Sequence, residues 1–111
     1  MNWIKLTTHN QIEELKSISM ERPVLIFKHS TRCSISSMSL DRLLRNWKEE
    51  DQAKVVPYLL DLIAYRSISD QIESDFAVAH QSPQVILIKQ GKAVFEDSHF
   101  GISYDRIMEK L

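Results

Sequence analysis

The fold is decided by the stretch Val24-Leu25-Ile26-Phe27-Lys28-His29-Ser30-Thr31-Arg32-Cys33-Ser34-Ile35-Ser36. Its first four residues are all apolar, which is typical of a strand that is buried on both faces. A polar loop, Lys28 to Arg32, then leads to Cys33, and the pattern from Ser34 onward is helical. The stretch therefore predicts a buried strand, a polar loop and a helix that begins at the cysteine.

The segments after this stretch continue the alternation of helix and strand. The helix that begins at Ser34 has apolar residues at i, i+3, i+4 and i+7, namely Leu40, Leu43, Leu44 and Trp47. A second buried strand covers Val55–Leu62, although its Pro57 lacks the N–H that a central strand needs. Ser67 with Asp70 predicts the cap of a third helix, which carries one apolar stripe: Ile68, Ile72, Phe76 and Ala79.

The two ends of the chain complete the pattern. A short strand at Ile4–Leu6 precedes a helix that Thr8 caps, with Gln11 as its reciprocal partner. Near the other end, Val85–Ile88 predicts a strand, and the two-residue turn Gln90-Gly91 returns the chain as the antiparallel strand Lys92–Glu96. A final helix starts at Ser103 and presents Tyr104, Ile107, Met108 and Leu111 on one face.

The predicted order is therefore β-α-β-α-β-α-β-β-α over residues 1–111. Strands that are joined through helices run parallel, and the late hairpin adds antiparallel strands. A chain of 111 residues without a linker-like stretch is expected to form one domain. We predict a single α/β domain with a central mixed sheet that is flanked by helices.

Composition excludes several classes of partner and places the chain in a compartment. The net charge of -1 gives no attraction to nucleic acid or to an anionic membrane. The longest apolar runs are far shorter than a membrane span. The N-terminus lacks the pattern of an export signal, and a lone cysteine fits a reducing compartment, so we expect a cytoplasmic protein. His9, His80 and His99 have no metal-ligand spacing, and we expect no metal site.

Cys33 is the candidate nucleophile. At the start of a helix, unpaired N–H groups and aligned peptide dipoles stabilise a thiolate, which is the form that attacks disulfides. Lys28, His29 and Arg32 add positive charge on the predicted loop, and Ser34 and Ser36 add hydroxyl groups. The alternative from composition alone is a small buried side chain, which is what most free cysteines are.

A second stretch, Ser82-Pro83-Gln84-Val85-Ile86-Leu87-Ile88-Lys89-Gln90-Gly91-Lys92, resembles the part of thioredoxin in which a cis-proline precedes an apolar strand and a turn. Gly101, before the last helix, also stands where that family has glycine. The resemblance covers nearly the whole chain and implies the thioredoxin fold. It further implies that Pro83 is cis and packs beside the cysteine, and that the backbone of Ser82 pairs with an extended substrate.

Within that superfamily, Phe27–Ser36 resembles the YtxJ-like monothiol proteins of the bacillithiol system, the monothiol bacilliredoxins. Their signature is Thr-Cys-Pro-Ile-Ser, and this sequence has Arg32 before the cysteine and Ser34 in place of the proline. The resemblance implies an oxidoreductase that removes bacillithiol, or a similar small thiol, from S-thiolated client proteins. That thiol is a co-substrate, and no bound cofactor is expected.

These expectations assign residues to roles. Cys33 is the nucleophile, and Ser36, which stands where a dithiol enzyme has its second cysteine, could donate a hydrogen bond to the thiolate or only start the helix. His29 could pair with the thiolate as a cation or lie exposed in the loop. The residues expected to contact substrate are His29, Arg32, Ser34, Ser82 and Pro83.

Two other functions remain open on sequence grounds. One is an iron–sulfur cluster carrier like the monothiol glutaredoxins, which use Cys-Gly-Phe-Ser where this chain has Cys-Ser-Ile-Ser at residues 33–36. The other is a thioredoxin-fold module that binds partners without turnover. Reactivity of the thiol separates that module from the enzyme.

Overall fold

The computed structural model describes residues 2–111 and contains one five-stranded sheet with the strand order β1-β3-β2-β4-β5. The strands are β1 (Ile4–Lys5), β2 (Val24–His29), β3 (Val56–Asp61), β4 (Gln84–Lys89) and β5 (Lys92–Ser98). The α-helices are α1 (Asn10–Ser19), α2 (Ser34–Asn46), α3 (Arg66–Phe76) and α4 (Tyr104–Lys110). Two short 3-10 helices, η1 (Glu49–Ala53) and η2 (His99–Gly101), complete the chain.

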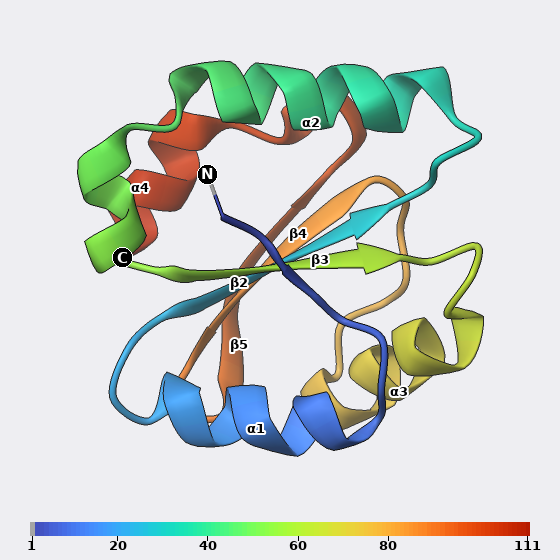
Figure 1. The fold of residues 1–111 in the computed structure, drawn as a ribbon, viewed down its shortest axis with the longest axis vertical. Coiled ribbons are helices and arrows are strands. Elements are labelled where there is room, and N and C mark those ends of the chain that lie inside the picture. Colours follow the sequence, from blue (N-terminus) through green and yellow to red (C-terminus); the bar gives the residue numbers. More distant parts are fainter. Residues whose placement is uncertain (1) are drawn as a thin grey trace.

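The sheet is mixed, as the order of elements predicts. Strands β1, β3 and β2 run parallel to one another, β4 is antiparallel to β2, and β5 is antiparallel to β4. Helices α1 and α3 cover one face of the sheet and α2 and α4 cover the other (Figure 1). This layered arrangement confirms the predicted fold class.

Each face of the sheet has its own apolar core, because successive side chains of a strand point to opposite faces. On β2, Val24 and Ile26 belong to the cluster under α1 and α3, whereas Leu25 and Phe27 belong to the cluster under α2 and α4. All four are fully buried. The burial of each such side chain contributes roughly 1.5–3 kcal/mol to folding. Because β2 supplies side chains to both clusters, it connects the two cores.

The hairpin and the proline of β3 have simple explanations. Gln90 and Gly91 both have positive φ (53° and 76°), which is the conformation of a type I′ turn, and the predicted hairpin is confirmed.

Pro57 lies in β3 one position before the pairing with β1 begins at Tyr58. The neighbouring Val56 N–H donates toward β2, so the nitrogen of Pro57 faces the unpaired side of the strand.

Several predicted helix ends are wrong by a few residues. The first helix has His9 rather than Thr8 at its cap position, whereas Gln11 is the partner of Thr8 as predicted, since its side chain accepts the Thr8 N–H at 3.0 Å. Ser67 and Asp70 do not cap α3, which starts at Arg66, and Asp70 forms an ion pair with Arg66. The helix ends at Phe76, since Ala77 is left-handed, so Ala79 lies outside the apolar stripe and is exposed. Ser103 does cap α4.

Candidate functional site

Cys33 caps the amino end of α2. Its backbone is extended (φ -111°, ψ 120°), its carbonyl accepts the Ser37 N–H at 3.1 Å, and the residue is partly exposed. Its own N–H donates to Ser30, which closes the turn that joins β2 to the helix. The sulfur therefore belongs to a residue at the positive end of a 13-residue helix, where an anion is favoured.

Pro83 lies at the same end of the sheet as Cys33. Lys28, the last paired residue of β2 on this side, faces Gln84, so Pro83 precedes β4 where β2 ends. Two hydrogen bonds join this proline to α2: Ser39 Oγ donates to the carbonyl of His99 at 3.1 Å, and the His99 N–H donates to the Pro83 carbonyl at 2.9 Å. The Ser82–Pro83 bond is cis.

Ser82 offers polar groups that the rest of the described chain leaves unused. Its hydroxyl is buried without a hydrogen-bond partner among residues 2–111. Its main-chain N–H and C=O make no hydrogen bond to other backbone groups in that range. The pairing of the Ser82 main chain with a bound segment, which the resemblance implies, stays a prediction.

Ser36 is bonded to residues other than Cys33. It is fully buried, its Oγ accepts the Ser30 N–H at 3.0 Å, and it lies 2.6 Å from His29 Nδ1. No hydrogen bond joins it to the Cys33 sulfur in the described chain. A buried hydroxyl proton needs an acceptor, and His29 Nδ1 is the one in reach. Ser36 therefore donates to His29 and fixes the loop between β2 and α2.

The imidazole ring of His29 is neutral near neutral pH. Burial lowers the pKa of His29 below its ordinary 6.5, and the Asp61 and Asp41 carboxylates oppose that effect only in part. Because Nδ1 accepts from Ser36, the ring carries its proton on Nε2. A neutral imidazole does not pair with the thiolate as a cation, so that sequence-based option is not supported near neutral pH.

The prediction that Lys28 lies in the loop is wrong. Lys28 is the fifth residue of β2, is fully buried and belongs to the face under α3, opposite to α2. Its ammonium donates to the Ser69 carbonyl at 3.3 Å and lies 3.4 Å from His80 Nδ1. Burial lowers the pKa of Lys28 to about 8, against the opposing charges of Glu73 and Asp70. It contributes no charge to the loop.

Arg32 and Ser34 flank Cys33 and are both exposed. Neither forms an ion pair or a side-chain hydrogen bond within residues 2–111. With Lys28 buried and His29 neutral, Arg32 is the cation that remains next to the cysteine. Both side chains are exposed to solvent, and their contact with a substrate stays a prediction.

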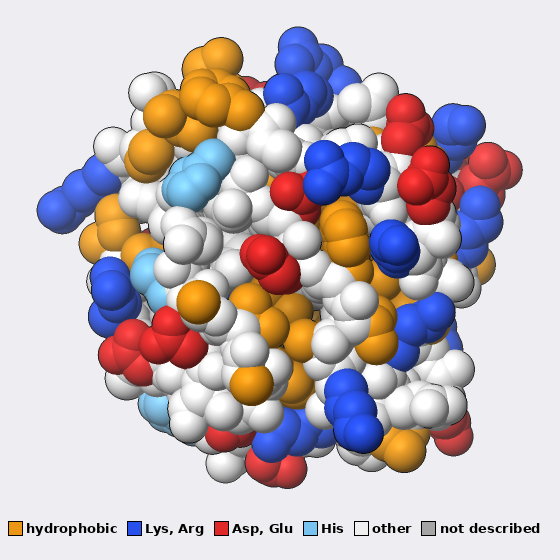
Figure 2. All heavy atoms as spheres, turned by 180° about the vertical axis from the view of Figure 1, so that it is seen from behind, with side chains coloured by type: hydrophobic (Ala, Val, Ile, Leu, Met, Phe, Trp, Pro, Cys, Tyr) orange, Lys and Arg blue, Asp and Glu red, His pale blue; other side chains and the backbone are white. Residues whose placement is uncertain are grey.

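Figure 2 shows hydrophobic side chains gathered at its upper left, on the side of the molecule where α2 begins. Met38 of α2 and Phe100 of η2 are 62% and 65% exposed and line one pocket of about 390 Å³. Because η2 is bonded to Pro83, this apolar patch adjoins the candidate site. No pattern in the sequence indicates this patch, because Phe100 approaches α2 only through the fold.

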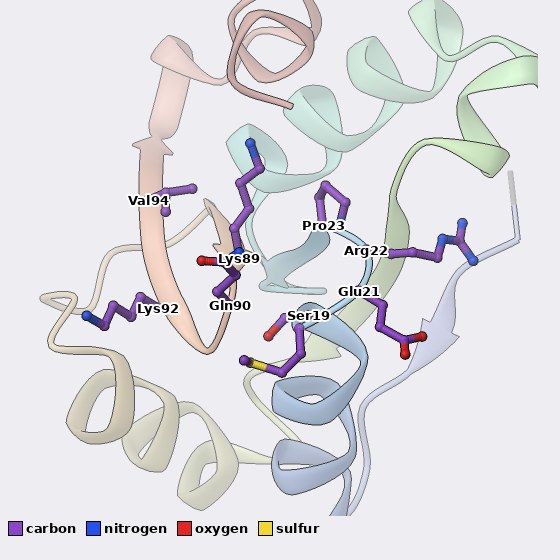
Figure 3. A pocket seen from close by; sticks show the side chains of 9 residues that line it. Ser19, Glu21, Arg22, Pro23, Lys89, Gln90, Lys92 and Val94 are labelled. Carbon is purple, nitrogen blue, oxygen red and sulfur yellow. The ribbon is translucent and has the colours of Figure 1, made fainter.

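The pocket in Figure 3 lies at the opposite end of the sheet, where β2 begins and β4 ends. It has a volume of about 610 Å³ and is bounded by residues 19–23 and by the turn between β4 and β5. Its residues do not adjoin Cys33, so size alone does not identify the site.

Across residues 2–111, no three His, Cys, Asp or Glu side chains converge on a possible metal site. The same range contains no helix long and apolar enough to cross a membrane.

Comparisons with known proteins agree with this geometry. The model of the family described as monothiol bacilliredoxin BrxC matches residues 4–107. A solved structure described as that of a proposed oxidoreductase with a thioredoxin fold has a TM-score of 0.82 and 28% identity, over 96% of this chain and 90% of that chain. Thioredoxin from Fasciola hepatica (TM-score 0.71, 17% identity, 96% and 93%) and thioredoxin O2 from Arabidopsis thaliana (0.72, 16%, 98% and 93%) share the fold.

Proposed function

Because the chain belongs to the monothiol bacilliredoxin family, we propose that this thiol oxidoreductase removes bacillithiol, or a similar small thiol, from mixed disulfides on client proteins. The observation that carries the proposal is the position of Cys33, which caps α2 and is partly exposed. It is the only cysteine in the chain, so exchange must use thiols from outside the molecule.

The proposed cycle has two exchange steps. The Cys33 thiolate attacks the sulfur of the small thiol in the client's mixed disulfide. A bond forms between Cys33 and the small thiol, the client S–S bond breaks, and the client cysteine leaves as a thiolate that takes a proton from water. A second small thiol, as its thiolate, then attacks the mixed disulfide on Cys33. This step releases a disulfide of two small thiols and regenerates Cys33, so the small thiol is the reductant.

Client binding is supported by two features at this end of the sheet. The unpaired main chain of Ser82 can form hydrogen bonds with an extended segment, which gives affinity with little sequence preference. The exposed side chains of Met38 and Phe100 add apolar contact area. Main-chain pairing and apolar contact both suit an extended protein segment, so we assign protein clients.

The direct test is turnover of a peptide that carries bacillithiol in a mixed disulfide, with free bacillithiol supplied in excess. We expect the wild-type protein to release the peptide thiol catalytically and Cys33→Ser to release it only at the uncatalysed rate. Ser37→Ala, an exposed neighbour on α2, serves as the control and should retain activity. Full activity in Cys33→Ser would show that the mechanism is wrong.

A further inference from the structure

A third pocket lies where the three parallel strands end. It has a volume of about 370 Å³, within the range of small-molecule sites, and is lined by residues that follow β1, end β3 and end β2. Its polar side chains are those of Lys5, Thr7, His29, Thr31, Asp61 and Tyr65. In open α/β sheets, ligands bind outside the carboxyl ends of parallel strands. We call this the strand-end pocket.

The pocket is tied to the nucleophile through the loop after β2. His29 and Thr31 line the pocket, and the same segment reaches Cys33 two residues later. The hydrogen bonds of Ser36 to His29 Nδ1 and to the Ser30 N–H hold this loop in place. A group that is covalently attached to the Cys33 sulfur would therefore have this pocket within a short reach.

The lining has the donors and acceptors of a site for a hydroxylated acid. Lys5 is exposed, and its ammonium has no carboxylate within ion-pair distance among residues 2–111. Thr7, Thr31 and Tyr65, each of which carries a hydroxyl group, and His29 line the same pocket. Asp61 is the one carboxylate of the lining, and its Oδ1 already accepts the N–H groups of Ile63 (3.1 Å) and Ala64 (3.3 Å). Lys5 is therefore the group that would pair with an acid.

We propose that the strand-end pocket receives the non-sulfur part of the small thiol while that thiol is disulfide-bonded to Cys33. The inference rests on the proposed function and adds a binding site to it. The ligand class is a small thiol that carries a carboxylate and several hydroxyl groups, as bacillithiol does. Lys5 binds its carboxylate, and the hydroxyls of Thr7, Thr31 and Tyr65 bind its hydroxyl groups.

The test compares two disulfides in their reaction with reduced Cys33. One is bacillithiol disulfide, and the other is bis(hydroxyethyl) disulfide, which has no carboxylate and is too small to fill the pocket. In each reaction Cys33 forms a bond to one sulfur, the original S–S bond breaks, and one thiol is released. The rate of the Cys33 adduct is followed by intact mass.

Two variants probe the charge and the space of the pocket. Lys5→Gln removes the cation, and Ala64→Trp fills the pocket from an exposed position. We expect each to slow the reaction with bacillithiol disulfide by about fivefold, which corresponds to one exposed charge pair or a comparable loss of contact. The reaction with bis(hydroxyethyl) disulfide should stay within about twofold of wild type. Ala53→Trp, an exposed alanine that precedes β3 at its other end, is the control for a surface tryptophan.

The outcomes separate the pocket from the proposed function. If both variants react with bacillithiol disulfide as fast as wild type does, or slow both disulfides equally, the pocket is not the binding site, and the exchange chemistry stands. If wild-type protein forms an adduct with neither disulfide, the proposed function fails and the pocket assignment fails with it. A selective loss with bacillithiol disulfide supports both.

Discussion

Lys28 is a cation that the fold buries without a carboxylate in contact. Its ammonium is bonded to the Ser69 carbonyl and lies beside His80, and burial lowers its pKa to about 8. Burial in turn lowers the pKa of His80, with the nearby Lys28 charge as the next cause. The two groups therefore disfavour each other's charged form, and the cluster stabilises the fold best when Lys28 is neutral.

This leads to a pH-dependent stability. Since the pKa of Lys28 is lower in the folded chain than its ordinary 10.5, the unfolded chain binds more protons as the pH rises through about 8. The free energy of unfolding should therefore rise, by about 2 kcal/mol between about pH 7 and pH 9.5. Lys28→Met should lack this rise. Urea unfolding of both proteins at the two pH values measures it, and parallel pH dependence in the two proteins would contradict it.

For single residues, the sequence predicts the position in a helix or strand better than the contacts of the side chain. The position of Cys33 at the start of a helix is confirmed, because a helix start is visible in the spacing of apolar residues. The prediction for Lys28 is wrong because a charged residue normally ends a buried strand. Its alternation with Val24 and Ile26 nevertheless places Lys28 on the face of β2 that these two residues occupy. The partners of Ser36 could not be predicted, since its bond to His29 depends on how the helix lies over the strand end.

Among the elements, helix α2 and the hairpin follow from local sequence patterns. The helix caps follow from such patterns less closely. Periodicity predicted the four helices and the main strands, because burial of one face dominates their stability. Thr8 keeps its predicted partner Gln11 but lies one residue before the cap position, whereas Ser67 contacts His9 and Asp70 pairs with Arg66. A cap contributes only about 1 kcal/mol, so other local or tertiary contacts override it.

The hairpin between β4 and β5 gives a prediction for a single element. Gly91 has φ +76°, and a Cβ built there meets no atom within 4 Å. Gly91→Ala should therefore lose about 1–2 kcal/mol of stability through backbone strain alone. Gln90→Asn, at φ 53°, should instead gain stability, because asparagine tolerates this left-handed region better than glutamine does. Thermal unfolding of the two variants tests this, and equal stability of Gly91→Ala and wild type would contradict it.

In the whole molecule, the sheet brings together segments that are distant in sequence. The β2–β4 pairing puts residues 29–33 and 82–83 at one end, and the order β1-β3-β2 adds residues 5–7 and 61–65 beside them. The family resemblance predicted the first juxtaposition. The strand-end pocket was not predicted, because its residues have ordinary surface identities and only the parallel strand ends bring them together.

The central claim is that the start of α2 keeps the Cys33 sulfur available as a reactive thiolate. The most direct measurement is the rate of Cys33 alkylation by iodoacetamide at neutral pH, in the native protein and in the urea-unfolded chain. We predict that the native protein reacts at least about threefold faster, because the helix amino end stabilises the anion. A native rate equal to or below that of the unfolded chain would contradict the claim.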